Sequence, residues 1–521
     1  MEPTLTGSGA QAGTAPGSAV IETGRRFSHS MLWQLQRKFY EQRGVEAWKK
    51  GFVPHYVTNN PTIAAAYARV ACAFLQDAMA AGKLDARQPV YLLELGAGSG
   101  RLAYHILRQL PAALERSGLK GQRVVYVLAD MAERNLEFWR SHPRLQPFFA
   151  SGQLDLARYD PLTEREIRLE RSGATLAAGA VTNPLVVLAN YFFCVIPVDI
   201  FSVQRGILFE ELVELASTDL RLVRDDPALL PGLAVELKPS FAAAPYYDDP
   251  EIDRLLHDYP AIMGDEYLTF PIAGLTCLRN LNMLAGGPLL ALTGDRGYAS
   301  LDALREQGRP EFSLHGNSLS MMVNFHALGE WVRRRGGERL FTQHRAEGLL
   351  AAAFEWGLPA GGDGQVRLAF AQELADGGPD DFFQVKRALE PHYAELSLEQ
   401  ILALLRLSGY DHNIFSGCSP RLLDLAGGCS PTDQERLCEV LDRAWEMYYA
   451  IGEPFNLPLA AARIYLAVGH GDKALVCLRE AERLYGPSAE TSELIRRCGE
   501  RAWASDFDPE GEHPSAENGR A

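Results

Sequence analysis

The sequence has few cysteines, and none of them forms a recognisable pair. Eight are scattered over 521 residues. None lies in a CxxC motif, and no group of histidine and cysteine has the spacing of a zinc site. The pattern therefore predicts no metal site and favours reduced thiols in a cytoplasmic protein.

Long apolar runs and basic clusters are also missing. No uninterrupted apolar run reaches the roughly 18–20 residues of a membrane-spanning helix. The formal net charge is −15, and no segment is rich in lysine and arginine. Nucleic-acid-binding proteins usually carry a basic face, because phosphate contacts supply most of their affinity. We therefore expect neither a membrane protein nor a nucleic-acid partner.

Both ends of the sequence lack the apolar periodicity of folded segments. Residues 1–24 are rich in Gly, Ala, Ser and Thr and contain neither arginine nor lysine. They have no compact apolar region either, so we expect a disordered arm and not a signal or transit peptide. Residues 506–521 are similarly polar and are expected to form a disordered tail.

The rest of the chain has the composition of a globular protein, with 47% hydrophobic and 22% charged residues. Short apolar segments alternate with segments of helical periodicity. This alternation predicts an α/β fold with a doubly wound, mostly parallel sheet. The expected strands are residues 90–95, 123–130, 153–160, 184–190 and 287–298.

The pattern also predicts the order of the domains. We expect a helical segment over 25–88 and an α/β domain over 89–375, with an inserted α+β region at about 200–285. Residues 376–505 have helical periodicity only. Residues 459–490 fit one tetratricopeptide repeat (TPR). Because solenoids need about three repeats to be stable, we expect a short TPR-like helical domain packed on the catalytic body.

A glycine-rich turn, ELGAGSGR, follows the first expected strand. Glycine permits a tight turn and close approach of backbone amides to a ligand, and the next helix offers unpaired N–H groups. Dinucleotide sites prefer GxGxxG, whereas this spacing is GxGxG after an acid. An acid suits the sulfonium and ammonium of S-adenosylmethionine (SAM), so SAM is favoured over NAD. The predicted SAM-binding residues here are Glu94, Gly96, Ala97, Gly98, Ser99 and Gly100.

Acidic residues in the next two strands are candidates for the rest of the cofactor. Asp130 ends the second strand, where a carboxylate can accept hydrogen bonds from both ribose hydroxyls. It could equally cap the helix that follows, and both roles can hold at once. Met131 comes directly after it and is included in the site. Leu154 and Asp155 are candidates for the adenine edge, unless Asp155 is simply a solvated strand end.

Four segments resemble class I SAM-dependent methyltransferases, specifically their MidA-like branch. HYVTNNPTIAAAYARVACAFL is similar to the segment before that family's first strand, and ELGAGSGRLAYHILR is similar to its cofactor loop. LANYFFCVIPVDIF resembles the stretch after its fourth strand, and HGNSLSMMVNFHALGEWVRRRG resembles a later segment. The resemblance covers about residues 50–345. The branch includes the mitochondrial complex I assembly factor that methylates a protein arginine.

The resemblance implies an acceptor pocket at the carboxyl ends of the strands. Tyr56 and Thr58 would close over the cofactor, or would only form a capped helix entry. Asn190 would bind the cofactor or the acceptor, or would satisfy polar groups of its own loop. Asp199 is a second candidate for catalysis, unless it caps a turn.

The chain departs from this branch at two positions. Tyr191 stands where the branch often has Glu, and Cys194 where it has Asp. Three acid–base side chains lie further along the chain, Asp295, His315 and His326. The turn-forming sequence Asp-Arg-Gly alone explains the presence of Asp295. Single histidines such as the other two more often have a structural role.

The sequence therefore predicts a SAM-dependent methyltransferase that acts on a protein side chain, arginine being one candidate, or on a small molecule. The alternative is a catalytically weak methyltransferase fold that serves as an assembly or binding protein. It would dock a protein partner through the TPR-like end.

Overall fold

The computed structural model describes residues 18–49, 53, 55–217, 225–315, 317–343, 349–359 and 364–505, with side chains up to residue 498. Most of the predicted arm over 1–24, and all of the predicted tail over 506–521, lie outside the described residues. The end of the arm is a strand and not a coil, since Ala19–Arg25 form β1. Its partner is β9 (Ile207–Ser217), about 190 residues away, so local composition gave no sign of the pairing.

The chain forms two compact units, residues 1–383 and 384–521. A seven-stranded sheet lies at the centre of the first unit, in the order β17-β18-β12-β7-β2-β3-β4. The five strands from β12 to β4 are parallel, and β18 is antiparallel to both of its neighbours. The predicted α/β sheet is therefore present. Its strands are β2 (Val90–Leu95), β3 (Val124–Asp130), β4 (Leu154–Arg158), β7 (Leu185–Leu188), β12 (Leu289–Asp295), β17 (Glu338–Phe341) and β18 (Leu350–Trp356).

The strand order reverses between β2 and β7. From β2 the chain continues to β3 and β4 on one side, whereas β7 and β12 lie on the other side. In open α/β sheets, ligands bind outside the carboxyl ends of the strands at such a switch point. The glycine-rich turn leaves the carboxyl end of β2, so it lies at this position.

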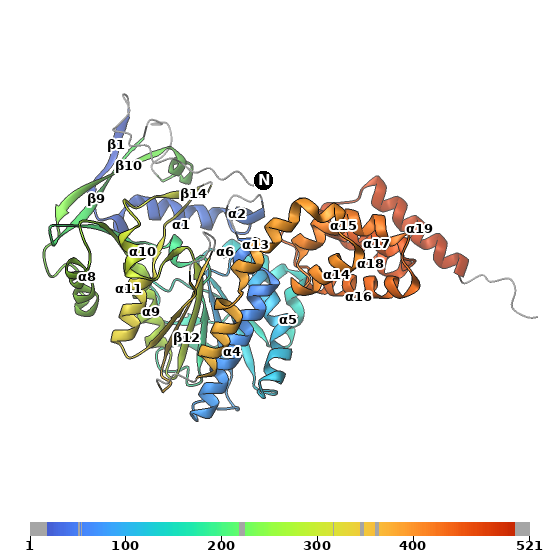
Figure 1. Cartoon of the computed structure of the whole chain (residues 1–521), viewed down its shortest axis with the longest axis horizontal. Coiled ribbons are helices and arrows are strands. Elements are labelled where there is room, and N and C mark those ends of the chain that lie inside the picture. The colour runs from blue at the N-terminus through green and yellow to red at the C-terminus, as the bar shows by residue number, and fades with distance from the viewer. Residues whose placement is uncertain are drawn as a thin grey trace, which may run out of the picture. The chain divides into compact units, whose positions relative to one another are not determined.

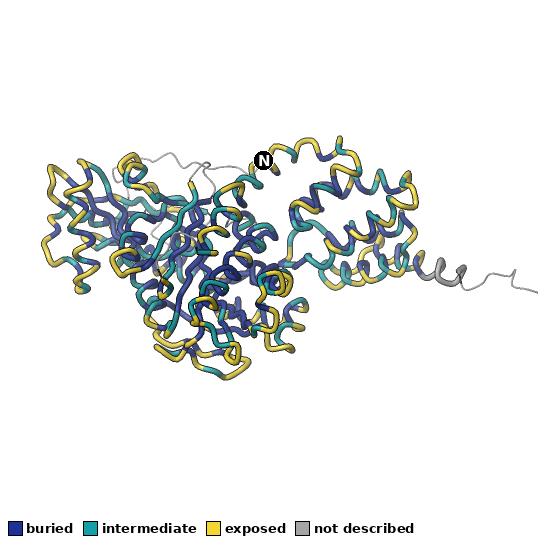
Figure 2. Tube along the Cα trace, turned by 60° about the horizontal axis from the view of Figure 1, so that its bottom comes forward, coloured by how far each residue is buried: buried dark blue, intermediate teal, exposed yellow. Residues whose placement is uncertain are grey.

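Helices cover both faces of the sheet (Figure 1). On one face, α4 (Pro61–Ala80) packs along α5 (Arg101–Arg116). On the other face, α9 (Ile272–Leu284) and α11 (Phe325–Arg334) share a buried apolar cluster with the strands. Buried residues follow the strands and the inner sides of these helices (Figure 2). The nearly continuous apolar strands are explained by this burial on both faces.

The inserted region forms a second sheet. It has the order β1-β9-β8-β11, with β10 also paired to β9, and all its pairs are antiparallel. A hairpin at Arg205-Gly206 joins β8 to β9, and both residues have positive φ. The elements of this region are β8 (Asp199–Gln204), β10 (Leu233–Phe241), α8 (Pro250–Ile262) and β11 (Tyr267–Phe270).

Two N-terminal helices, α1 (Met31–Arg43) and α2 (Glu46–Lys49), lie across the carboxyl ends of the central sheet (Figure 1). We call them the cap. The smaller elements of this unit are α3 (Tyr56–Asn59), α6 (Glu133–Ser141), α7 (Gln146–Ala150), β5 (Ile167–Arg168), β6 (Thr175–Leu176), β13 (Gly297–Tyr298), α10 (Leu301–Arg305), β14 (Ser313–His315), β15 (Ser318–Ser320), β16 (Val323–Asn324) and α12 (Gln365–Phe370).

The second unit is helical. Helices α17 and α18 form an antiparallel hairpin at the predicted TPR-like segment, with Ala474, Leu478 and Ala481 buried. Its assignment as a TPR stays a prediction. Helix α13 (Pro379–Leu389) spans the boundary between the units. The other helices are α14 (Leu398–Leu407), α15 (His412–Ala426), α16 (Pro431–Met447), α17 (Leu457–Ala467), α18 (Gly471–Tyr485) and α19 (Ala489–Ser505).

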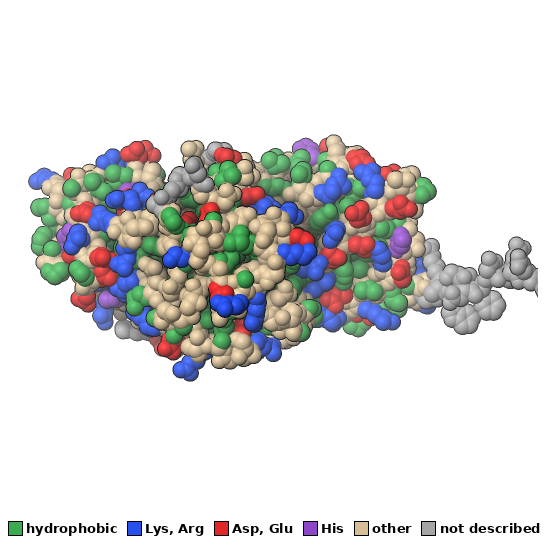
Figure 3. Space-filling view, turned by 90° about the horizontal axis from the view of Figure 1, so that it is seen from below, with side chains coloured by type: hydrophobic (Ala, Val, Ile, Leu, Met, Phe, Trp, Pro, Cys, Tyr) green, Lys and Arg blue, Asp and Glu red, His purple; other side chains and the backbone are tan. Residues whose placement is uncertain are grey.

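Among the helices of the described residues, none is both long and apolar enough to cross a bilayer. The same residues hold no group of three or more His, Cys, Asp or Glu that could bind a metal ion. On the face seen in Figure 3, basic and acidic side chains are intermixed.

Candidate functional site

The predicted glycine turn, residues 96–100, connects β2 to α5. Gly96, Gly98 and Gly100 have φ angles of +60°, +54° and +74°. This left-handed region favours glycine because a Cβ atom would be strained there. The helix α5 begins immediately afterwards at Arg101. The turn therefore has a conformation that other residues would resist, and in it Gly96 is exposed while residues 97–100 are buried.

Two aromatic rings pack against the turn. A Cβ atom built on Gly98 would lie 3.0 Å from the indole of Trp48, and one built on Gly96 would lie 3.1 Å from the ring of Phe192. The indole of Trp48 also stacks on Tyr40, with 6.0 Å between the ring centroids. The cap thus covers one side of the turn, and the chain after β7 covers the other side.

Asp130 ties the turn to the end of β3. Its Oδ2 accepts hydrogen bonds from the Gly98 amide at 3.1 Å and from Asn135 Nδ2 at 2.9 Å. Its Oδ1 accepts one from the Ala132 amide at 2.9 Å, at the start of α6. Burial raises the pKa of this carboxyl, and these hydrogen bonds act in the opposite direction. The Met131 amide also stabilises the charged form of Asp130, so a ligand hydroxyl would have to share one of these acceptor positions.

The acid before the turn, Glu94, is buried. Tyr126 donates a hydrogen bond to its Oε2 at 2.8 Å. Burial raises the pKa of Glu94 to about 8, against the effect of this bond, and the charge of Asp130 raises it further. Alternation along the paired strands puts Glu94 and Asp130 on the same face of the sheet.

Three further predicted residues lie in or beside the turn. The Ala97 amide donates to the carbonyl of Ala129 at 3.1 Å, which fastens the turn to β3. Ser99 is buried, and its Oγ accepts a long bond of 3.4 Å from the Arg101 amide. Met131 follows Asp130 at the same edge of the sheet.

The structure does not bring Leu154 and Asp155 to this edge. They begin β4, whose carboxyl end is Arg158, so they lie near its opposite end. The carboxylate of Asp155 accepts bonds from the amides of Leu156, Arg171 and Ser172 at 2.8, 2.8 and 3.0 Å. Their assignment to the adenine edge stays a prediction that this position does not support. The carboxylate holds a neighbouring chain segment. The strand predicted over 153–160 already implied that Asp155 lies near its amino end.

Asn190 follows β7 and connects it to two helices. Its Nδ2 donates to the carbonyl of Thr58 at 2.9 Å, and its Oδ1 accepts from the hydroxyl of Tyr67 at 2.7 Å. A Cβ atom on Gly294 would lie 3.1 Å from Asn190 Oδ1, so a glycine is needed beside this pair. Tyr67 was missed from the sequence, although it is a polar side chain in the apolar face of a helix.

The predicted pair Tyr56 and Thr58 lies in α3, beside Asn190. Thr58 is buried and donates its hydroxyl to the carbonyl of His55 at 3.0 Å. The ring of Tyr56 lies 5.9 Å from that of Phe383. The two residues thus share the sheet edge that carries the glycine turn, and Thr58 is bonded to the loop that follows β7.

That loop, residues 190–195, is called here the β7 loop. Tyr191 has a φ of +46°, which is unusual for a residue other than glycine. Such conformations cost of order 1–3 kcal/mol and concentrate at functional sites. The loop places Phe192 on the glycine turn, and the Phe193 amide donates to Asp295 Oδ2 at 2.9 Å.

Asp295 ends β12 and is completely buried. Its Oδ1 is a buried atom with no hydrogen-bond partner. Burial raises the pKa of Asp295 to about 7, although the Cys194 thiol and the amides of the β7 loop lower it. Burial, followed by the charge of Asp295, also raises the pKa of Cys194, which makes the thiol a poor nucleophile. Asp295 was set aside at the sequence level because turn chemistry explained it.

Asp199, the second predicted catalytic residue, lies elsewhere. It begins β8 in the inserted sheet and is buried. Its carboxylate accepts bonds from the Ser28 amide at 2.9 Å and the Tyr247 hydroxyl at 2.7 Å. Asp199 therefore joins the N-terminal segment to the inserted region. His326 contacts Tyr259 at 2.9 Å and also belongs to this packing.

The cap is bonded to the β7 loop. Gln36 donates to the carbonyl of Val195 at 2.7 Å and accepts from the Leu319 amide at 2.6 Å. The hydroxyls of Tyr40 and Ser318 lie 2.7 Å apart. Nothing in the sequence indicated that α1 covers the site, because these contacts join residues far apart in the chain.

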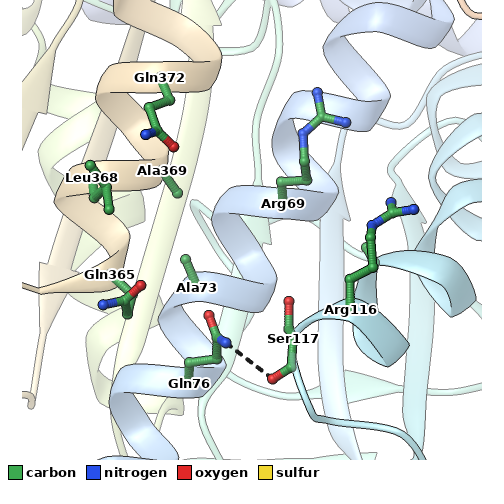
Figure 4. Close-up of a pocket in the computed structure, with 10 residues that line it drawn as sticks. Arg69, Ala73, Gln76, Arg116, Ser117, Gln365, Leu368, Ala369 and Gln372 are labelled. Atoms are coloured by element: carbon green, nitrogen blue, oxygen red, sulfur yellow. Dashed lines mark hydrogen bonds between the residues drawn. The ribbon is translucent and has the colours of Figure 1, made fainter.

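A cavity of about 170 Å³ lies away from the glycine turn, among α4, α5 and α12 (Figure 4). In it, Gln76 donates to the carbonyl of Ser117 at 3.1 Å. None of the predicted cofactor or catalytic residues lines this cavity. The lining residues are Arg69, Ala73, Gln76, Ala113, Arg116, Ser117, Gln365, Leu368, Ala369 and Gln372.

Comparison with protein families gives one match. Residues 70–252 match the family described as "Putative S-adenosyl-L-methionine-dependent methyltransferase". The matched segment contains the glycine turn, Asp130 and the β7 loop. No curated protein matches the chain.

Solved structures give matches at low identity. An uncharacterized protein from Burkholderia thailandensis is 15% identical, covering 66% of this chain and 89% of its own, with a TM-score of 0.39. A "likely methyl transferase" from the same organism, bound to S-adenosyl-homocysteine, is 16% identical, covering 67% and 90%, with a TM-score of 0.41. A SAM-dependent methyltransferase from Leishmania major is 10% identical, covering 66% and 100%, with a TM-score of 0.27.

Proposed function

We propose that this protein, a SAM-dependent methyltransferase with SAM as its cofactor, transfers the methyl group to a nitrogen or oxygen atom of an acceptor bound beside the β7 loop. The observation that carries the proposal is the position of the glycine turn. It lies at the switch point of the sheet, and its Gly98 amide is bonded to a buried carboxylate of the next strand. The β7 loop and Asp295 border the same edge.

The residues at this edge fit the chemistry of SAM. Gly96 is the exposed residue of the turn, and Asp130 lies where a carboxylate can accept a bond from a ribose hydroxyl. Burial raises the pKa of Glu94 to about 8, and an ammonium group beside it would favour its charged form. Trp48 and Phe192 fill the space that Cβ atoms on the turn would take, which gives the cofactor two aromatic walls. Bound SAM supplies a methyl group on a positively charged sulfur, which departs as a neutral thioether.

The chain's own residues would then orient the acceptor and take its proton. Asp295 is the candidate proton acceptor, because its buried Oδ1 has no partner at the sheet edge. A general base works best with a pKa near the working pH, and burial raises the pKa of Asp295 to about 7. Asn190 is a positioning residue, since both ends of its amide are already bonded to Thr58 and Tyr67.

We assign the protein to the MidA-like branch within this proposal. The carboxylate that the branch carries at position 194 is replaced by Cys194, and Asp295 lies against this thiol. Asp295 thus supplies a carboxylate beside position 194, where the branch has an acid and this chain has Cys194. The acceptor is a protein side chain or a small molecule.

An assembly or binding role is the second candidate. It is favoured by Trp48 and Phe192, whose rings already cover the turn, so the site could be held closed. In this case the TPR-like end would dock a protein partner.

Transfer of radiolabelled methyl groups from SAM separates the two candidates. The full chain would be incubated with protein and metabolite fractions of a cell extract. Gly98→Arg places a bulky side chain against Trp48. Gly308→Arg is a matched control, because Gly308 also has positive φ but no atom lies within 4 Å of its Cβ direction. We expect label in a fraction with the wild type and the control only. Label that persists with Gly98→Arg, or is absent with the wild type, would contradict the proposal.

A further inference from the structure

Arg296 lies at the same edge of the sheet, directly after Asp295. It is half-buried, and its Nε is a buried atom without a hydrogen-bond partner. It forms no ion pair with the residues that the structure describes. Asp295, its neighbour in sequence, is one of these residues, and the carboxylate of Asp295 accepts a bond from the β7 loop.

Other half-buried arginines of this chain are paired. Arg37 contacts Asp160 at 2.6 Å, and Arg279 contacts Asp249 at 2.6 Å. An arginine has five N–H donors in a planar fork that matches carboxylate and phosphate groups. Leaving a buried donor of this kind unpaired is unfavourable, so it calls for an external anion.

The charge of Arg296 acts on Tyr191 and Cys194 in the β7 loop and on His315 in β14. Burial lowers the pKa of His315, and the charge of Arg296 lowers it further. Burial raises the pKa of Tyr191, and Arg296 is the cation that opposes this rise. Two carboxylates, Asp295 and Asp380, also act on Tyr191. Tyr191, in turn, is the strained residue of the loop.

This corner is close to the glycine turn. Phe192 packs on Gly96, and Cys194, only two residues later, lies against Asp295. The β7 loop therefore borders both the glycine turn and the end of β12. An acceptor bound at Arg296 would lie beside the loop that contacts the turn.

We propose that Arg296 binds an anionic group, a carboxylate or a phosphate, on the methyl acceptor, and thereby places the acceptor's nucleophilic atom beside Asp295. This inference rests on the proposed function and deepens it. It disfavours a cationic acceptor such as an arginine side chain, because a like charge beside Arg296 would be repelled.

The proposed methyl transfer would form one bond to the methyl carbon and break another. The lone pair of the acceptor nitrogen or oxygen forms the bond to the methyl carbon. The carbon–sulfur bond breaks, and its electron pair stays on sulfur. The acceptor proton passes to Oδ1 of Asp295.

Anion binding to the full-length protein tests the inference. Inorganic phosphate and succinate would be titrated calorimetrically, each in the presence of S-adenosyl-homocysteine. We expect at least one of them to bind the wild type, with at least tenfold weaker binding for Arg296→Gln and an intermediate loss for Arg296→Lys. Arg309→Gln changes an exposed arginine and serves as the control. Succinate alone would indicate a carboxylate acceptor, and phosphate alone a phosphorylated one.

The result that overturns the inference is equal affinity in the wild type and Arg296→Gln, or no binding of either anion to the wild type. S-adenosyl-homocysteine binding is measured in the same titrations. If it persists while anion binding is absent, only this inference fails. If it is absent, the proposed function fails as well.

Discussion

The indole of Trp48 lies against Gly98, at 3.0 Å from the position that a Cβ atom would occupy. The cap and the glycine turn are therefore in direct contact, although they are 50 residues apart in the sequence. A ligand that approaches the turn amides meets this ring first. Two consequences follow, a change of environment for Trp48 on binding and a requirement for glycine at the contact.

Tryptophan fluorescence should report cofactor binding through Trp48. Addition of S-adenosyl-homocysteine changes the surroundings of this ring, so we expect an emission change that saturates with ligand. The chain contains seven tryptophans, so Trp48→Phe identifies the source. The variant should lose most of the change. A change of equal size in Trp48→Phe would show that another tryptophan reports and that the cap does not respond.

Asp130 and Asp155 should respond differently to the same substitution. Asp130→Asn weakens the bond to the Gly98 amide, and we expect at least tenfold weaker S-adenosyl-homocysteine binding in calorimetry. Asp155→Asn disturbs three backbone bonds at the other end of the sheet. It should lower the free energy of unfolding by about 1–3 kcal/mol and leave the affinity unchanged. The reverse pattern would contradict the placement of the site.

Tyr67 should stabilise the protein through its bond to Asn190. Tyr67→Phe leaves the buried amide oxygen without its donor, so we expect a loss of about 1–2 kcal/mol in denaturant unfolding. Tyr393→Phe is a control, because the Tyr393 hydroxyl is buried without a hydrogen-bond partner. Its removal should be neutral or stabilising. If Tyr67→Phe and Tyr393→Phe lower the free energy of unfolding equally, the bond between Tyr67 and Asn190 makes no specific contribution to stability.

The pH dependence of stability should reveal the buried carboxyl of Asp295. Its folded-state pKa is about 7, against about 3.9 in an unfolded chain. The folded protein therefore keeps the proton between these values while the unfolded chain releases it. The stabilisation is complete below about pH 4 and is lost as pH rises to 7, by up to about 4 kcal/mol.

Asp295→Asn removes this dependence and isolates it from other groups. We expect the variant to have a higher melting temperature than the wild type at pH 8, and the difference to vanish or reverse at pH 4. Methyl transfer should be lost in the variant at both pH values. A wild-type advantage that grows towards pH 8 would show that the carboxylate is stabilised in the fold and is not a poised base.

Local patterns predicted the turn and the strands, because both depend on short-range rules. The glycines need positive φ. Asp130 ends one apolar strand and Asn190 follows another, so the sequence alone could predict that both lie at the carboxyl edge of the sheet. Asp155 lies near the amino end of its strand, which the predicted range 153–160 already implied. Asp199 begins β8 of the second sheet, and the pairing of that sheet, which includes β1, could not be predicted from local patterns.

Other parts of the site depend on contacts between distant segments. Trp48 is joined to Gly98 and Tyr67 to Asn190 only in the folded chain. Asp295 had a sufficient local explanation in its turn. Its burial, and the missing partner of its Oδ1, arise from the β7 loop about 100 residues earlier. No periodicity or spacing in the sequence carries this information.

Equilibrium binding of S-adenosyl-homocysteine tests most directly whether the glycine turn holds the cofactor. Calorimetric titration would compare the full-length wild type with Gly98→Arg and the matched control Gly308→Arg. We predict saturable one-site binding for the wild type and the control, and none for Gly98→Arg in a protein that remains folded by circular dichroism. Binding that survives Gly98→Arg unchanged, or that is absent from the wild type, would contradict the claim.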